Sequence, residues 1–206
     1  FSEMEIRAAL RTNVIGSNII PISMGSNTLC QGTFTLMDDI VKYLPSPENK
    51  EIAGINMNTK EVFQANYDFA KAKSAYVFKT IVDPFIGKYS LIKVCSGVFK
   101  SDDMIYNQDR DIDERVSKLY VLQGGKPIEV PELHAGDIGA IAKLNSVQTG
   151  DSLATKANPI VYPKTILSTP YTYKRYKAVK KGDEDKIAQA LARMASEDQT
   201  LKIVND

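Results

Sequence analysis

The feature that most constrains the fold of this chain is a succession of short, strand-like segments between Ser74 and Ala154. The segments are rich in β-branched and aromatic residues, and small groups of turn residues such as Gly124-Gly125 separate them. They lie at 74–82, 88–98, 117–123, 137–144 and 151–154. Short strands with regular turns are typical of a closed β-barrel or a β-sandwich. We therefore expect one small, mainly β domain at residues 74–160.

Two helices are expected before this domain. Ser2 and Glu5 have the spacing of a capping box, which predicts a helix over 2–16. Residues 35–47 carry apolar side chains at helical spacing and end in two prolines, which predicts a second helix that stops there. Both helices lie in a first region, which we place at 1–47.

The other flanking segments carry weaker patterns. Three isoleucines within 19–25 predict a short buried strand that ends at Gly25. Residues 48–73 are polar and mixed, and we interpret them as a linker that holds one irregular strand at most.

The end of the chain predicts a β-α-β unit, which is half of a ferredoxin-like fold. Its strands are expected at 171–180 and 199–206, on either side of an amphipathic helix at 182–198. The acidic first turn of that helix complements the helix dipole. We place this last region at 161–206.

Composition argues against several classes of function. The formal net charge is +1, which does not indicate a strongly basic nucleic-acid-binding protein. His134 is the only histidine, which excludes histidine-pair metal sites. Cys30 and Cys95 have neither metal-ligand spacing nor a disulfide framework, which favours a reducing, cytoplasmic setting. The sequence also has no apolar run of about 18 residues, the length that a membrane-spanning helix needs. "LQGGKPIE" does not match the phosphate-loop pattern, and we interpret it as a hairpin turn.

One basic cluster lies in "YTYKRYKAVKK", residues 171–181. Five lysine or arginine side chains alternate there with three tyrosines. Lysines that protect an exposed edge strand are one interpretation. Contact with an RNA backbone is the other, because basic and aromatic side chains together suit nucleic acid.

Four motifs, taken in order, resemble those of translation elongation factor G. "GSN…GTFTLMDDIVKYLPSP" is similar to the end of that family's GTPase domain, a Gly-Ser-Ala loop followed by a helix that ends in Tyr-Leu-Pro-Ser-Pro. "FKTIVDPFIGKYSLIKVCSG" is similar to the start of its second domain. "AGDIGAIAKLNSVQTGDSL" resembles the strands that close the second domain, and "KIAQALARMASEDQTLKI" resembles the first helix of the third.

The resemblance implies a mainly β fold with α/β flanks. A translation-factor-type antiparallel β-barrel would be preceded by the last strand and helix of a P-loop GTPase domain and followed by the partial ferredoxin-like β-α-β unit. The chain would then be a fragment of a ribosome-dependent GTPase that promotes translocation. GTP and Mg²⁺ would be bound by the parent protein, with the Mg²⁺ ligands and the hydrolytic residues outside this fragment. The fragment itself would have no catalytic residue and no bound cofactor.

The resemblance also implies sites. Gly25, Ser26 and Asn27 occupy the position of the Gly-Ser-Ala loop, which supports the guanine ring through a backbone N–H. The barrel would rest on small-subunit ribosomal RNA. The candidate RNA contacts, chosen for charge near turns and strand ends, are Lys88, Lys93 and Lys100. Exposed strand lysines with no RNA role are the alternative.

Some positions depart from the family pattern. Asn27 stands where alanine is usual and Gln199 where proline is usual, which suggests a divergent paralogue. A ribosome-protection or recycling GTPase of the same superfamily therefore stays open. An alternative of a different class is a stand-alone, non-enzymatic β-barrel that binds RNA or protein. In either case we expect the fragment to be a monomer.

Overall fold

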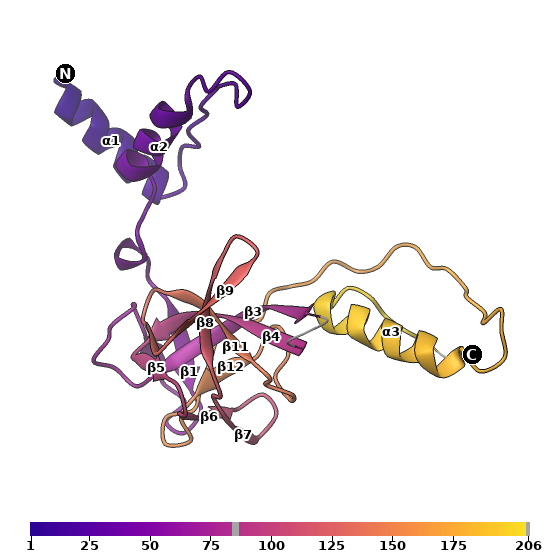
Figure 1. Cartoon of the computed structure of the whole chain (residues 1–206). Coiled ribbons are helices and arrows are strands. Elements are labelled where there is room, and N and C mark those ends of the chain that lie inside the picture. The colour runs from indigo at the N-terminus through magenta and orange to yellow at the C-terminus, as the bar shows by residue number, and fades with distance from the viewer. Residues whose placement is uncertain (84–86, 205–206) are drawn as a thin grey trace. The chain divides into compact units, whose positions relative to one another are not determined.

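The computed structural model describes residues 1–83 and 87–204 (Figure 1). Its backbone divides into two compact units, Phe1–Lys50 and Glu51–Asp206. The first unit is helical, and the second contains all the strands that are described. The units are treated separately below.

The unit Phe1–Lys50 contains α1 (Glu3–Ile15), α2 (Thr33–Tyr43) and a short 3₁₀ helix, η1 (Pro47–Asn49). The predicted capping box is present. The Glu5 backbone N–H donates to Ser2 Oγ (3.3 Å), and the Ser2 backbone N–H donates to the Glu5 carboxylate (2.7 Å). Both predicted helices are confirmed, and α2 ends before Pro45 because the residue before a proline disfavours helical backbone.

The predicted buried strand at 19–25 is wrong. No strand forms in the described part of this segment, and Ile20 and Ile22 are 83% and 87% exposed. A strand needs a neighbouring strand to satisfy its backbone groups, and the unit Phe1–Lys50 contains none. The segment is apolar as its isoleucines indicate, but no strand of this unit pairs with it and no core of this unit covers it.

The second unit is built on an eight-stranded antiparallel sheet in the order β7-β6-β12-β3-β4-β11-β8-β9. Its strands are β3 (Ser74–Asp83), β4 (Gly87–Ser96), β6 (Met104–Asn107), β7 (Ile112–Arg115), β8 (Leu119–Gln123), β9 (Lys126–Val130), β11 (Ile138–Ala142) and β12 (Ser152–Ala154). A two-stranded ladder of β5 (Val98–Lys100) and β10 (Glu132–His134) completes the barrel. The mainly β fold with helical flanks is confirmed, and all five predicted strand segments are strands.

The barrel encloses one main hydrophobic core. Its largest fully buried side chains include Phe99, Ile92, Leu119 and Ile141, which come from four different strands. The predicted hairpin turn at "LQGGKPIE" is confirmed, because Gln123 pairs with Lys126 across the β8–β9 turn. Pro84, predicted to break the first long strand, lies outside the described residues.

The interpretation of residues 48–73 as a linker needs correction. They contain β1 (Ala53–Asn56) and β2 (Val62–Gln64), which form a three-stranded sheet with β13 (Ile160–Val161). A separate cluster of buried residues, including Ala65 and Tyr162, packs in this region. Two short strands separated by polar turn residues show no clear apolar periodicity, and their partner strand lies about 100 positions away in the sequence.

The end of the chain is simpler than predicted. The helix is confirmed as α3 (Glu184–Glu197), but no strand forms at 171–180 or at 199–204. Residues 205–206 of the second expected strand lie outside the described part. In a ferredoxin-like unit, such strands pair within a larger sheet. The described residues provide no such sheet at this end of the chain, so the two segments form no strand.

Candidate functional site

The first candidate site is the loop that precedes α2. Ser26 and Gln31 exchange two backbone hydrogen bonds, with N···O distances of 2.9 and 3.0 Å, and these close the loop. A Cβ atom on Gly25 would lie 2.6 Å from the Gln31 carbonyl oxygen, so this position requires glycine. Gly32 then begins α2 with a φ of 80°, a conformation that favours glycine.

This loop borders a small hollow of about 210 Å³. Gly25 and Asn27 line it, together with Gly32 and Thr33 at the start of α2. Ser26 is half-buried, and its hydroxyl accepts a hydrogen bond from the Leu29 backbone N–H (3.4 Å). The three residues predicted for this site therefore lie on one closed loop, with two of them facing the hollow and the third bracing the loop.

The three lysines predicted to contact RNA are not brought together. The Lys88 ammonium donates to the backbone carbonyl groups of Asn145 (3.4 Å) and Val147. Burial lowers the pKa of Lys88 from its ordinary value. Lys93 lies five residues along the same strand, so the two side chains leave opposite faces of β4. These lysines are separate features and do not form one basic patch.

The other two lysines also have partners within the barrel. The Lys93 ammonium lies over the Tyr67 ring, 5.1 Å from its centroid. The Lys100 ammonium lies 3.4 Å from the Glu132 carboxylate, and its side chain is 63% exposed. An exposed pair of this kind contributes little to stability, so Lys100 can exchange its partner at low cost.

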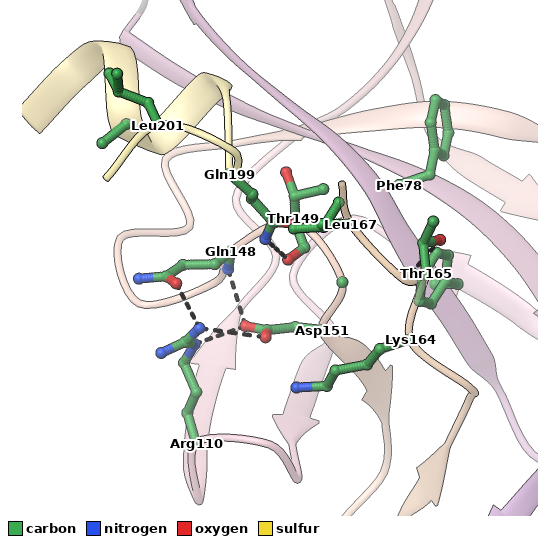
Figure 2. Close-up of a pocket in the computed structure, with 13 residues that line it drawn as sticks. Phe78, Arg110, Gln148, Thr149, Asp151, Lys164, Thr165, Leu167, Gln199 and Leu201 are labelled. Carbon is green, nitrogen blue, oxygen red and sulfur yellow. Dashed lines mark hydrogen bonds and ion pairs between the residues drawn. The ribbon is translucent and has the colours of Figure 1, made fainter. Parts of the chain in front are cut away.

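A larger cavity of about 550 Å³ lies beside the barrel, where the loop Gln148–Asp151 faces the end of α3 (Figure 2). The Asp151 carboxylate is buried there and accepts hydrogen bonds from Arg110 Nε (2.7 Å), Asn107 Nδ2 (2.8 Å) and the Gln148 backbone N–H (2.9 Å). The Gln199 side chain donates to the Thr149 carbonyl from the opposite side.

Sequence reasoning missed this network. The Asp151 carboxylate closes the turn Gln148–Asp151 by accepting the hydrogen bond from the Gln148 backbone N–H. The sequence feature that could have indicated the network is a polar cluster, "NQDRD", about forty positions before Asp151. The cluster lies close to Asp151 only because β6 pairs with β12, and the sequence does not reveal that pairing. Because Arg110, Asn107 and the Gln148 backbone all donate to the Asp151 carboxylate, the network braces the barrel.

Two further reactive side chains, His134 and Cys95, have partners or are buried within the barrel. His134 Nε2 lies 3.2 Å from the Glu132 carboxylate, and its ring meets the edge of Phe69. Cys95 is fully buried, and burial raises the pKa of its thiol to about 11, which keeps the thiol protonated near neutral pH. Across residues 1–83 and 87–204, no group of three or more His, Cys, Asp or Glu side chains is placed to hold a metal ion. Within the same residues, no helix has the length and apolar character that a membrane crossing requires.

Comparisons with known proteins bear on this arrangement. Residues 72–156 match the family model described as elongation factor G domain 2. Elongation factor G of Cytophaga hutchinsonii is 32% identical over 207 aligned positions, which cover 100% of this chain and 29% of that protein. The chain therefore spans less than a third of the length of this curated relative.

A solved structure agrees with the fold. The crystal structure of ttk003000868 from Thermus thermophilus superposes with a TM-score of 0.76 and 24% sequence identity, over 98% of this chain and 28% of that one. At this identity the match supports the fold alone. The matched model and the relative lead to one conclusion: residues 72–156 are an elongation factor G domain 2, and the chain as a whole is similar to part of an elongation factor G.

Proposed function

We propose that this chain acts within a ribosome-dependent GTPase that promotes translocation during protein synthesis. The observation that carries the proposal is the family match of the barrel at residues 72–156, set within a chain that aligns from end to end with an elongation factor G. The barrel has its own hydrophobic core of buried side chains. On this proposal the barrel serves to dock, and the hydrolysis of GTP belongs to the whole protein.

We assign the loop at Gly25–Asn27 to the guanine base. The hollow beside it is bordered by backbone of the loop and by the first turn of α2. Backbone N–H groups at such a place can read a carbonyl oxygen without any particular side chain. GTP would be held mainly by residues beyond this loop, with Mg²⁺ on its phosphates, and this loop would contribute base recognition only.

We assign the barrel to small-subunit ribosomal RNA. Lys93 and Lys100 are the contacts we favour, because the ammonium of each has only a weak partner at the surface. Lys88 is the least suited of the three, since its ammonium is already bound to the backbone carbonyl groups of Asn145 and Val147. Few contacts of this kind, mostly to phosphates, position a protein on RNA without a large net charge.

The test uses the full-length protein and measures GTP hydrolysis with and without 70S ribosomes. We expect a large rise in rate when ribosomes are added. No rise would contradict the proposal and would favour the alternative of a non-enzymatic β-barrel that binds RNA or protein.

A second candidate function is ribosome protection or recycling by the same type of GTPase. Gln199, which replaces the usual proline, ties the end of α3 to the barrel through the Thr149 carbonyl. Such a contact between the end of α3 and the barrel would suit a different orientation of the region that follows the barrel. A translocation assay on messenger RNA separates the candidates: movement of the message supports the first, and subunit splitting or drug release without movement supports the second.

A further inference from the structure

Residues 51–66, here called the strap, directly follow the unit Phe1–Lys50 and precede the first long strand of the barrel. They contain β1 and β2, which pair with each other as a hairpin. The base of this hairpin is closed where the Ala65 backbone N–H donates to the Ile52 carbonyl (2.9 Å). The strap is therefore a length of chain that is folded back on itself between the unit Phe1–Lys50 and the barrel.

A short ladder attaches the strap to the rest of its unit. β1 pairs with β13 at two positions, Ile55–Val161 and Asn56–Ile160. By contrast, β3 and β4 of the barrel pair over the whole length of both strands. Within the described parts of the chain, neither β1 nor β2 pairs with a strand of the eight-stranded sheet. The strap can therefore detach without breaking a ladder of the barrel.

The strap also packs on a small core of its own. Ala65 is buried with Cys95, Ile160 and Tyr162 in a cluster that is separate from the main barrel core, and Phe63 of β2 packs against this cluster. As far as the structure describes the chain, the strap contributes no side chain to the main core. Segments that rest on separate cores can open with separate free energies.

Tyr162 provides the surface on which the strap is seated. Its hydroxyl lies 2.6 Å from Ser74 Oγ, and its backbone N–H donates to Ser152 Oγ (2.9 Å), so it is held by the barrel strands β3 and β12. Gly54 of the strap lies directly against it. A Cβ atom on Gly54 would be 3.1 Å from Tyr162 Cε1 and 2.9 Å from the Val161 carbonyl oxygen. The seated strap therefore requires glycine at this position.

The strap ends at a strained bend. Asn66 and Tyr67 have φ values of 48° and 55°, in the left-handed region that is costly for most residues other than glycine. Directly after the bend, the Tyr67 backbone N–H donates to the Cys95 carbonyl (3.0 Å), which fixes the chain to β4. The bend can relax when the strap leaves its seat, and it therefore lies at the position of a hinge.

We propose that the strap opens as one unit while the barrel stays folded. A detached hairpin of this size is marginally stable in water, so the opened strap becomes flexible chain. The ends of such a chain lie roughly 20 Å apart on average, so opening lengthens the connection between the unit Phe1–Lys50 and the barrel. The contacts described above all lie within residues 51–162, and the role of the strap is to hold this length of chain in reserve.

The test measures amide hydrogen exchange of the chain by mass spectrometry, at several urea concentrations below the unfolding transition. Strap peptides should exchange about tenfold faster than β4 peptides, or more. Their exchange should also depend less on urea, because opening of the strap exposes less surface than global unfolding. Equal rates with equal urea dependence in the strap and in β4 would overturn the proposal.

Two alanine variants test the seat of the strap. Gly54→Ala should speed exchange in the strap about fivefold or more and leave β4 unchanged, because the added methyl group has no room against β13. The matched control is Gly125→Ala in the β8–β9 turn, where a Cβ atom meets nothing within 4 Å, and it should change neither region. If Gly54→Ala accelerates the strap and β4 equally, the strap does not open by itself.

A third variant weakens the barrel instead. Ile92→Val trims a fully buried side chain of the main core. It should speed exchange in β4 roughly two- to tenfold and leave the strap unchanged. Equal acceleration in both regions would mean that the strap opens only when the whole unit unfolds, which contradicts the proposal. The assay contains neither GTP nor ribosomes, so its failure is distinct from failure of the proposed GTPase function.

Discussion

The unit Phe1–Lys50 and the barrel differ in what covers their apolar side chains. No residue of the first unit is buried, and Phe34 on α2 is 81% exposed. In the barrel, Phe99 and Ile92 are fully buried within one core. In both regions the spacing of apolar residues in the sequence predicts the helices or strands that the structure contains. The difference teaches that periodicity sets the type of element, whereas a core requires a second apolar surface to meet the first.

The largest expected effect comes from truncating one phenylalanine in each region. Phe99→Ala should lower the free energy of unfolding of the barrel by about 3–5 kcal/mol, because it leaves a cavity in a packed core. Phe34→Ala should change the free energy of unfolding by about 0.5 kcal/mol or less, since its ring is already in solvent. Urea titration followed by tyrosine fluorescence and circular dichroism measures both. Similar losses of unfolding free energy for the two variants would contradict the difference between a buried and an exposed phenylalanine.

The next effect sharpens the comparison within the barrel. Asp151→Ala removes a carboxylate whose side chain is only 2% exposed, and it leaves the Asn107 amide without its acceptor. We expect a loss of about 2–3 kcal/mol in the free energy of unfolding, reduced from the cost of a fully buried pair because Arg110 is about one-third exposed.

The matched control for that change is Asp113→Ala. Asp113 pairs with Lys156 at the surface, with 42% of its side chain exposed. Its loss should cost less than about 1 kcal/mol. Equal costs for the two aspartates would mean that the network around Asp151 does not brace the barrel.

A smaller effect is expected at the start of α1. Ser2→Ala removes the hydroxyl that accepts the Glu5 backbone N–H. Such caps are worth roughly 0.5–1 kcal/mol, so amide exchange in the first turn should quicken about two- to fivefold. Hydrogen exchange measured by mass spectrometry reports it, and the barrel amides should keep their protection. A change that spread into the barrel would show that the two units are not independent.

The smallest perturbation is chemical labelling of the two cysteines. Cys30 is exposed, and Cys95 is buried with its thiol pKa raised to about 11. A raised pKa keeps the Cys95 thiol protonated below that value, so at about pH 8 only about one in a thousand is a thiolate. Iodoacetamide should add one label to the folded chain, on Cys30, and a second after denaturation. Equal labelling rates in the folded chain would contradict a closed barrel core.

Much of the fold could be predicted from the sequence. The central barrel strands are largely buried on both faces, as at β4, and their β-branched and aromatic residues give a strong pattern. The edge strand β9 was missed because four of its five residues are exposed and it contains Pro127, a residue that argues against a strand assignment. Strands β1 and β2 were missed because their partner, β13, is distant in the sequence.

The candidate sites were harder to predict. The resemblance identified the loop at Gly25–Asn27, and its closure by Ser26 and Gln31 emerged only from the structure. Charge alone selected Lys88, and charge does not indicate whether an ammonium group points outward or into the barrel. The strand predicted at 171–180 failed because alternation of tyrosine and basic residues resembles a strand even where no neighbour exists to pair with it.

The most direct test of the central claim is a cryo-electron microscopy map of the full-length protein, held on the 70S ribosome by a non-hydrolysable GTP analogue. We predict density for the barrel, residues 72–156, against small-subunit ribosomal RNA, with the face that carries Lys93 or Lys100 at the contact. A ribosome without bound protein, or a bound protein whose barrel makes no contact with small-subunit RNA, would contradict the account.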